Sequence, residues 1–268
     1  MITEGTGIAT PFDPKLGVHH DPADLTFRYD EGVFGPKPEF RPLDSIRRSL
    51  RNPNCDGPDP VYSIVMDVGR EEHRDELQRR MLLFGIVAYA AGRLGDEPVR
   101  SQGHIHKIAP HCGWSTPELF EIWQGSAIIY AQEGATDDPG QCVAVVAGEG
   151  DQVVVPPGWV HTVINADPNS QLVFGAWCDR QYGFEYDQVR AHGGPAWFPL
   201  LDENWQMRWD ANPSYIGSDL SVRPARAYPE LGLTPRVPIY EQFAVNPESV
   251  QWVSDPARFG PLWGDFEP

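Results

Sequence analysis

The sequence predicts an all-β fold, built as an antiparallel barrel or jelly roll. Between residues 61 and 177, short runs with strand composition follow one another. Turns rich in glycine and proline separate these runs, which is typical of antiparallel barrels. One run carries two histidines at the two-residue period of a strand, His104 and His106. A third histidine, His161, follows a Pro-Pro-Gly turn.

The composition limits the partners and the compartment. The chain has 268 residues, 41% of them hydrophobic, enough for one large domain or two small ones. A formal net charge of −17 argues against nucleic acid or an anionic membrane surface as a partner. The four cysteines form no CxxC pair and are expected to be free thiols in a reducing compartment. Without a visible signal peptide or apolar span, the expected location is the cytoplasm.

The first third of the chain is expected to lead into the barrel. Residues 1–40 are rich in proline, glycine and aspartate and predict an extended arm. Residues 43–50 (LDSIRRSL) predict a short amphipathic helix. Residues 61–68 have strand composition, and residues 81–91 (MLLFGIVAYAA) predict a buried strand. The charged residues 71–80 between them predict an exposed segment.

The central region contains the strands that carry the histidines. Residues 99–106 predict the first of them, and residues 107–117 form an inserted loop. Residues 119–132 predict two strands hinged at Gly125. Four more short strands are predicted, at residues 142–146, 152–155, 161–164 and 171–177.

The pattern changes after residue 179, where aromatic residues recur in a proline-rich tail that cannot form a core of its own. The chain is therefore divided into three predicted parts. Residues 1–40 form the N-terminal arm and residues 41–215 the barrel domain. Residues 216–268 form a C-terminal extension that wraps the barrel or a partner subunit.

The three histidines predict a metal site. Residues two apart on a strand point to one face, so the His104 and His106 imidazoles can hold one ion. His161 and a carboxylate would complete a set of three nitrogens and one oxygen. Such a set suits one divalent ion of iron, manganese, nickel or zinc and leaves positions open for substrate. Glu118 and Glu121 are the carboxylate candidates, and because they differ by three, only one can join the histidines.

A second cluster of reactive side chains lies in the inserted loop. His111 and Cys112 could act as extra metal ligands or as a thiol–imidazole pair. No third member is evident. The sequence contains no GxSxG, Walker or GxGxxG pattern, so the hydrolase, NTPase and dinucleotide-binding classes have no support.

These residues resemble the cupin superfamily. Its motif G(x)5PxG(x)2H(x)3N is matched at every position, by Gly150, Pro156, Gly158, His161 and Asn165. Its motif G(x)5HxH(x)3-4E(x)6G is matched in part. The histidine pair fits, and Glu118 lies seven residues before Gly125 while Glu121 does not fit that spacing. The resemblance therefore favours Glu118 and implies a double-stranded β-helix. The first glycine position is Pro98, and the loop between His106 and Glu118 is long.

One branch, the cupin-type (archaeal-type) glucose-6-phosphate isomerases, resembles the chain over about residues 35–215. A Gly-x-x-Gly turn leads into Ser-Gln-Gly-His-Ile-His, and the later stretches Pro-Pro-x-x-x-His-x-x-x-Asn, Glu-Tyr and Asn-Pro are also similar. These stretches are Gly92–Gly95, Ser101–His106, Pro156–Asn165, Glu185-Tyr186 and Asn212-Pro213.

The resemblance implies an enzyme that interconverts glucose 6-phosphate and fructose 6-phosphate, or a related sugar, as in glycolysis and gluconeogenesis. The reaction would pass through a cis-enediol with Glu118 as the base. Tyr186 would close over the sugar, and Tyr62, Ser101 and Gly103 would contact the phosphate. A homodimer is expected by the same analogy.

The chain also departs from the pattern of that branch. Several positions that contact substrate in the family are replaced, and most are now apolar: Val87, Gln102, Phe120, Trp177 and Phe184. Two alternatives therefore stay open. One is a cupin metalloenzyme of another class, an Fe(II) oxygenase or an epimerase or dehydratase acting on a less polar molecule. The other is a non-catalytic metal-binding or sugar-binding cupin.

Overall fold

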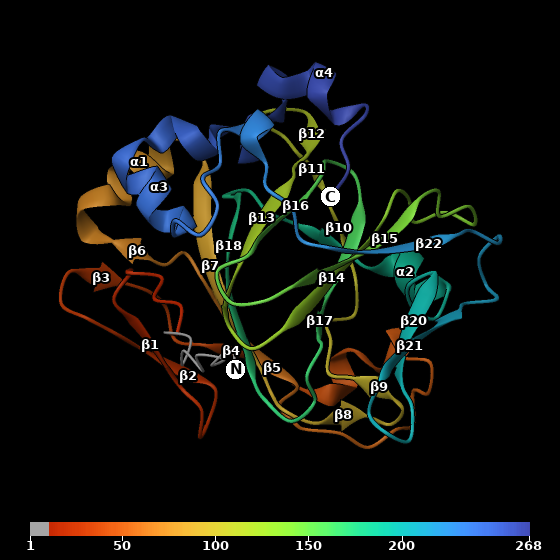
Figure 1. Cartoon of the computed structure of the whole chain (residues 1–268). Coiled ribbons are helices and arrows are strands. Elements are labelled where there is room, and N and C mark those ends of the chain that lie inside the picture. Colours follow the sequence, from red (N-terminus) through yellow and green to blue (C-terminus); the bar gives the residue numbers. More distant parts are fainter. Residues whose placement is uncertain (1–10) are drawn as a thin grey trace, which may run out of the picture.

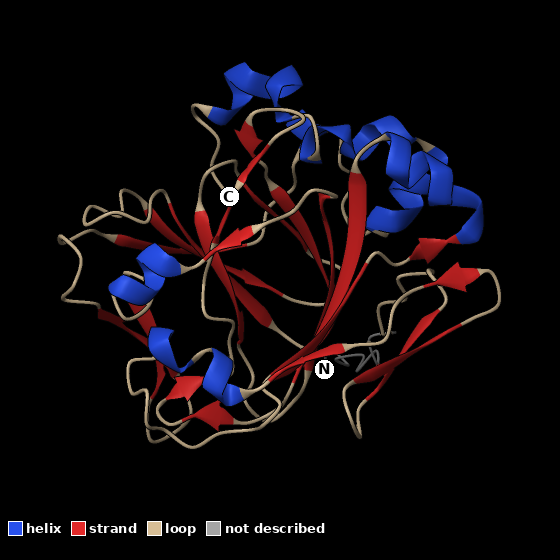
Figure 2. Cartoon of the chain, turned by 180° about the vertical axis from the view of Figure 1, so that it is seen from behind, coloured by secondary structure: helices blue, strands red, loops and turns tan. Residues whose placement is uncertain are grey.

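The computed structural model describes residues 11–268, so the first ten residues of the predicted arm lie outside the described range. The two largest sheets face each other around a shared core (Figure 1). The short helices lie around the outside of these strands, as Figure 2 shows. The predicted all-β jelly-roll barrel is therefore confirmed.

The larger sheet has six antiparallel strands and the smaller sheet has four. In spatial order the larger sheet comprises β16 (Gln152–Val155), β13 (Glu118–Gln124), β18 (Leu172–Asp179), β7 (Leu82–Tyr89), β5 (Tyr62–Met66) and β4 (Glu39–Arg41). The smaller sheet comprises β17 (Val160–Asn165), β14 (Ala127–Gln132), β15 (Cys142–Ala147) and β22 (Leu220–Pro224). Its last strand, β22, runs parallel to β15.

Short two-stranded sheets accompany the two sheets of the barrel. They pair β1 (Val18–Asp21) with β2 (Thr26–Tyr29), β3 (Val33–Phe34) with β6 (Gly69–Arg70), β8 (Arg93–Leu94) with β9 (Glu97–Pro98), β10 (Ile105–His106) with β19 (Phe184–Glu185), β11 (Ile108–Ala109) with β12 (Trp114–Ser115), and β20 (Trp197–Leu201) with β21 (Met207–Ala211). The α-helices are α1 (Arg74–Arg79), α2 (Asp187–Ala191), α3 (Ile239–Val245) and α4 (Gly260–Trp263). The 3₁₀ turns are η1 (Leu43–Ser45), η2 (Arg47–Ser49), η3 (Glu71–His73), η4 (Pro229–Leu231), η5 (Pro247–Val253) and η6 (Pro256–Phe259).

The helix predicted over residues 43–50 is wrong in type. The segment forms the two turns η1 and η2, separated by Ile46, whose φ of −113° departs from the helical value. Ile46 is fully buried, and the Arg47 guanidinium donates to the Cys55 carbonyl at 2.8 Å. These tertiary contacts outweigh the local helical preference, which is worth only a fraction of a kcal/mol, about 0.5, per residue.

The segment predicted to be exposed, residues 71–80, is partly buried. It forms η3 and α1, and Leu77 is fully buried against the core that contains α3. A single leucine in a charged run produces no helical periodicity, so the sequence alone did not indicate this contact.

The strand predicted over residues 99–106 is irregular. Only single bridges join Arg100 to Ile164 and His104 to His161, and β10 begins at Ile105. Gly103 interrupts the segment with a φ of +85°, a conformation that favours glycine. The other predicted strands lie within two residues of their expected ends.

The outer face of the six-stranded sheet is covered by the C-terminal helices. The Trp177 ring on β18 stacks on Tyr240 of α3, with ring centroids 5.4 Å apart and an interplanar angle of 15°. The Trp177 indole donates to the Ile239 carbonyl at 3.3 Å. Figure 1 shows α3 beside α1 at the edge of the barrel. The division into arm, barrel and extension stays a prediction, because no independent observation bears on its boundaries.

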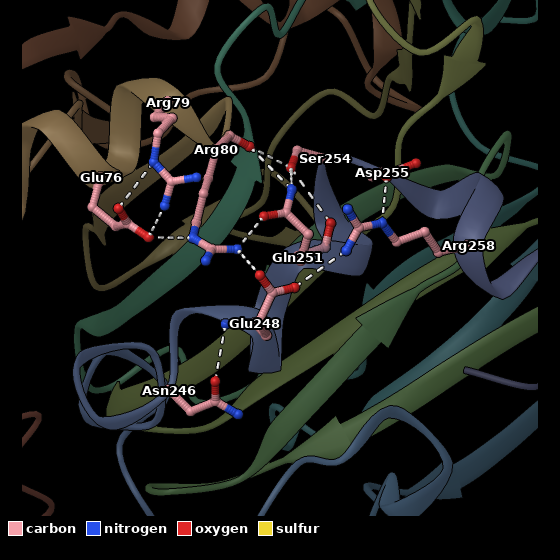
Figure 3. Close-up of polar contacts among 9 residues, drawn as sticks. All are labelled: Glu76, Arg79, Arg80, Asn246, Glu248, Gln251, Ser254, Asp255 and Arg258. Carbon is pink, nitrogen blue, oxygen red and sulfur yellow. Dashed lines mark hydrogen bonds and ion pairs between the residues drawn. The ribbon is translucent and has the colours of Figure 1, made fainter.

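A polar network holds the extension to α1 (Figure 3). The Arg80 side chain is only 11% exposed, and its Nη1 lies 2.7 Å from both Glu248 and Gln251 oxygens. Its Nε lies 2.6 Å from Glu76. The Arg80 carbonyl accepts from the Ser254 hydroxyl at 2.7 Å. Main chain and side chain of one residue therefore bind the same segment.

Replacing Arg80 with methionine should lower the free energy of unfolding by about 1–3 kcal/mol, because the change leaves partly buried partners without their charged donor. The matched control is Arg79→Met. The Arg79 side chain is 63% exposed and also pairs with Glu76, and its removal should cost less than about 0.5 kcal/mol. Urea unfolding of both variants measures the difference. Equal losses would show that Arg80 is not the residue that holds the extension.

Candidate metal centre

Three segments bring the predicted histidines together. His104 follows the Gly103 turn and forms a bridge with His161, in which each backbone N–H donates to the other carbonyl (3.1 and 2.9 Å). His106 lies on β10, and its ring is 5.3 Å from that of His104. His161 is the second residue of β17, which follows the turn at Gly158. The three imidazoles therefore meet on one inner wall of the barrel.

Glu118, the first residue of β13, completes the cluster. Its Oε2 lies 3.1 Å from His106 Nε2 and 2.9 Å from His161 Nε2. One ligand atom from each of Glu118, His104, His106 and His161 lies within 4.8 Å of all the others. The predicted set of three nitrogens and one oxygen is thus assembled in one place.

The hydrogen bonds of the imidazoles show that this set fits a cation. His106 Nδ1 lies 2.8 Å from the Thr116 carbonyl, and His161 Nδ1 lies 3.3 Å from the Trp159 carbonyl. A carbonyl only accepts, so Nδ1 carries a proton, and in the neutral form of each ring the lone pair of Nε2 faces the Glu118 carboxylate. Acceptors that face one another at about 3 Å are stabilised by a positive ion between them.

The burial of the cluster supports the same conclusion. His104 Nε2 and His106 Nε2 are buried without a hydrogen-bond partner, and orphaned buried nitrogens are costly unless a ligand satisfies them. Burial, together with His161 and His106, holds the pKa of His104 well below its ordinary value. Burial acts to raise the pKa of Glu118, but the close contacts with His106 and His161 outweigh burial and lower that pKa. The cluster therefore favours a neutral His104 and an ionised Glu118, the forms that bind metals.

Glu121 lies outside the cluster, on the opposite face of β13. Its side chain is 1% exposed, its Oε1 accepts from the Ile239 N–H at 2.9 Å, and its Oε2 accepts from the Trp123 indole at 3.0 Å. Burial raises its pKa to about 8. The choice between the two glutamates that the sequence left open is therefore resolved in favour of Glu118 as the member of the cluster.

A cavity opens beside the cluster, between the inner faces of the two sheets. Of the predicted substrate contacts, Tyr62, Ser101 and Tyr186 line it. Gly103 belongs to the adjoining turn but is not among the residues that line the cavity. The complete lining is Arg41, Tyr62, Ile64, Met66, Gly85, Val87, Tyr89, Ser101, Gln102, His104, Glu118, Phe120, His161, Val163, Phe174, Ala176, Cys178, Phe184 and Tyr186.

Four of the five replaced positions also line the cavity: Val87, Gln102, Phe120 and Phe184. The Phe184 ring lies 4.2 Å from that of His104 and covers it. Trp177 is the exception, because it pairs with Leu119 on the outer face of the sheet. The resemblance placed this residue in the site by counting from Asn165, and the alternation of β18 places its neighbours in the cavity instead.

Several cavity residues were missed by the sequence reasoning. Arg41 lies in β4, within a few residues of the predicted arm, and Tyr89 and Cys178 lie in strands that were predicted simply to be buried. Strand alternation could have placed Tyr89 and Val87 on one face. It could not have placed Arg41, whose strand joins the sheet only through β5.

The loop histidine and cysteine do not pair with each other. His111 Nε2 lies 3.1 Å from an Asp179 oxygen and 3.0 Å from the Ser254 carbonyl. The Cys112 thiol points to the carbonyls of its own loop, at Ala109 and Trp114. The thiol–imidazole alternative is therefore not supported. Within residues 11–268, no helix is long and apolar enough to span a membrane.

Comparisons with known proteins identify the family of the chain. The family model described as "Glucose-6-phosphate isomerase (GPI)" matches residues 49–215. A glucose-6-phosphate isomerase of Sinorhizobium medicae is 29% identical over 133 residues, which cover 49% of this chain and 56% of the relative. A glucose-6-phosphate isomerase of Thermococcus kodakarensis is 24% identical over 162 residues, which cover 59% of this chain and 74% of the relative. The chain thus spans between about half and three quarters of these curated relatives.

Matches among solved structures are more distant. A variant of the oxalate decarboxylase of Bacillus subtilis superimposes with a TM-score of 0.33 and 15% identity, covering 48% of this chain and 29% of that one. Vicilin from Corylus avellana superimposes with a TM-score of 0.37 and 11% identity, covering 59% of this chain and 37% of that one. Because the family model spans more than half of the residues, including the whole four-residue cluster, the chain belongs to the glucose-6-phosphate isomerase (GPI) family.

Proposed function

We propose that the protein is a metal-dependent aldose–ketose isomerase that acts on glucose 6-phosphate and fructose 6-phosphate or a related sugar phosphate. The observation that carries the proposal is the convergence of His104, His106, Glu118 and His161 within 4.8 Å beside a cavity. Membership of the GPI family supports the reaction class, and the donor set supports a metal.

The four residues of the cluster would hold one divalent ion of iron, manganese, nickel or zinc. Such an ion, when bound, polarises a sugar carbonyl and acidifies the neighbouring hydroxyl and C–H groups. The chain itself fixes the rings. The Thr116 and Trp159 carbonyls set the tautomers of His106 and His161, and the Phe184 ring covers His104.

Glu118 is the proposed base. Both imidazole contacts converge on its Oε2, so one oxygen can complete the metal set while Oε1 moves a proton between C1 and C2 through a cis-enediol. The neighbouring Phe120 and Val163 line the cavity and exclude water from the reacting carbons. Exclusion of water from the pocket would raise the basicity of this carboxylate. A bound cation would act on the sugar instead, by making the proton that Glu118 takes more acidic.

Tyr186, Tyr62 and Ser101 are the proposed substrate contacts. Tyr186 approaches from β19 and α2, with its ring 5.8 Å from that of His104, and would close over the sugar. Tyr62 and Ser101 line the cavity and would reach the phosphate, together with the Gly103 backbone. Burial raises the pKa of Tyr186, so its hydroxyl is a donor at neutral pH.

The apolar lining favours a second candidate, a cupin metalloenzyme that acts on a less polar molecule. Ile64, Met66 and Phe174 line the cavity, and Val87 stands where the family uses a threonine. An oxygenase would consume oxygen, whereas an isomerase would not. A third candidate, a metal-binding or sugar-binding cupin without catalysis, would bind ligands and turn none over.

The test is isomerisation by protein stripped of metal and reloaded with iron(II), manganese(II), nickel(II) or zinc(II), with fructose 6-phosphate supplied and glucose 6-phosphate measured. Turnover that depends on the metal is the expected result. A protein that holds metal, converts no sugar phosphate and consumes oxygen with another substrate would replace the first candidate by the second.

Replacing His104 with alanine should weaken binding of the metal at least about 100-fold, because one of four ligands is lost. Metal content after dialysis and the metal-induced rise in melting temperature measure the effect. His192→Ala is the control, because His192 lies outside the cluster and contacts Asp137. Unchanged metal content in the His104 variant would place the metal elsewhere.

We further propose a cytoplasmic homodimer. Four free cysteines suit a reducing compartment. Val146 of β15 and Val222 of β22 are 42% and 52% exposed on adjacent strands, and apolar side chains on such an edge suit a second copy. Sedimentation at several concentrations distinguishes the monomer from the dimer.

A further inference from the structure

Arg41 gives the cavity its positive charge. Among the lining residues of the described chain, it is the only lysine or arginine, and most of its neighbours in the wall are apolar or aromatic. A guanidinium beside such a surface is costly to bury unless an anion accompanies it. Its position therefore needs a partner or a ligand.

The register of the sheet aligns Arg41 with two tyrosines of the cavity wall. Arg41 of β4 lies opposite Tyr62 of β5, which lies opposite Tyr89 of β7, so the three side chains form one row on the inner face. The rings of Tyr62 and Tyr89 are 4.9 Å apart. Ser101, the predicted phosphate contact, lines the same cavity and shares a 2.9 Å hydrogen bond with Thr162.

The metal cluster lies at a different level of the same face. Tyr89 lies opposite Leu172 of β18. Four residues further along β18, Ala176 lies opposite Phe120 of β13. Glu118 lies beyond Phe120, two residues further along β13. The register therefore places Arg41 and Glu118 at different levels of the same sheet, and both residues line the cavity.

An exposed residue, Glu39, takes up part of the hydrogen-bonding capacity of the Arg41 guanidinium. Its Nη1 donates to Glu39, whose side chain is 67% exposed, while the Arg41 side chain is 26% exposed. The guanidinium has five N–H donors, so a pair made through one nitrogen leaves capacity for a second acceptor. Arg41 lines the cavity together with Tyr62 and Tyr186.

Gln102, one of the replaced substrate positions, offers no such charge. Its side-chain oxygen accepts from Arg190 Nε at 2.9 Å. Arg190 also lies over the Tyr186 ring, 4.8 Å from its centroid, and does not line the cavity. The cation within the cavity thus comes from β4.

We propose that Arg41, which lines the same cavity as the metal cluster, binds the anionic group of the substrate together with Tyr62 and Ser101. This inference rests on the proposed function, since it assigns the phosphate end of the same substrate. The Arg41 contact would favour phosphorylated sugars over neutral sugars, and Arg41 lies outside the family's motifs.

The experiment compares Arg41→Gln, Arg41→Lys and a matched control, Arg223→Gln. Arg223 is also on a strand, its side chain is 25% exposed, and it pairs with Glu267, whose side chain is 66% exposed. Both glutamine variants therefore lose one similar ion pair and one positive charge. Binding of fructose 6-phosphate, fructose and inorganic phosphate to the metal-free protein is measured by calorimetry, and melting temperatures confirm that each variant is folded.

In Arg41→Gln the dissociation constant of fructose 6-phosphate should rise at least about tenfold, as expected for the loss of a charged hydrogen bond. Arg41→Lys should restore part of that loss. Arg223→Gln should change it less than about twofold, and binding of fructose should be unchanged in every variant. With metal restored, the KM for fructose 6-phosphate should rise in parallel while kcat changes little.

Unchanged binding of fructose 6-phosphate in Arg41→Gln, or an equal loss for fructose or in Arg223→Gln, would overturn the assignment. Failure of the proposed function has a different signature. The wild-type protein would then isomerise no sugar phosphate with any metal, whereas the calorimetric comparison would still decide whether Arg41 binds the anion.

Discussion

Replacing Glu118 with glutamine should abolish isomerisation, with a fall in kcat of about 10³-fold or more, and should weaken metal binding. The amide cannot accept the proton that a base must take, and general-base catalysis contributes about 10²–10⁴-fold. The amide also removes the negative charge that contacts both His106 and His161 through one oxygen. The substitution therefore removes both the general base and one metal ligand.

The control is Glu121→Gln, which makes the same change three residues away on the same strand. Glu121 points to the outer face, where it binds the Ile239 N–H, so its replacement should leave kcat within about twofold and metal content unchanged. Steady-state kinetics and metal analysis of both variants measure the contrast. Full activity in Glu118→Gln would eliminate Glu118 as the base, and loss of activity in the folded Glu121 variant would show that the outer face matters for turnover.

The stability of the protein should fall as the pH rises between about 4.5 and 8, and Glu121 should cause much of the change. Burial raises the pKa of Glu121 to about 8 from an ordinary value of 4.5, which the unfolded chain retains. Between these values the folded state holds a proton that the unfolded state has released, so each rise in pH favours unfolding. The total effect is about 4–5 kcal/mol, because each unit of pKa corresponds to about 1.4 kcal/mol. The contribution is fully present below this window and is lost above it.

Urea unfolding of the wild type and Glu121→Gln at several pH values measures this effect. The variant should be less stable at low pH by about 1–2 kcal/mol, because an amide has one oxygen for the two donors, Ile239 and Trp123. Its stability should then depend on pH much less than that of the wild type. Parallel pH profiles for the two proteins would show that Glu121 does not titrate in this range.

Local patterns identified much of the site. Three of the four cluster residues could be identified because their spacing has a direct geometric meaning. Residues two apart share a face of a strand, and a Pro-Pro-Gly turn starts a new strand at His161. The fold class followed from the same kind of information, since short strands and frequent turns specify an antiparallel barrel. The family motif added Glu118 as the preferred carboxylate.

The remaining features depend on contacts between distant segments. The choice between Glu118 and Glu121 needed the register of β13 against β16 and β18, because eleven loop residues separate this strand from the histidines. Trp177 was assigned to the site by counting residues, and the pairing of β18 placed it on the outer face.

The sequence by itself determined the barrel, the three histidines and a choice of two carboxylates, because strand alternation and turn chemistry act over a few residues. Only the tertiary structure decided which carboxylate completes the cluster, that the tail covers the outer face, and that Arg41 lines the cavity. These outcomes arise from the pairing of strands and the burial of side chains across the whole chain, and a linear pattern does not specify which distant segments will meet.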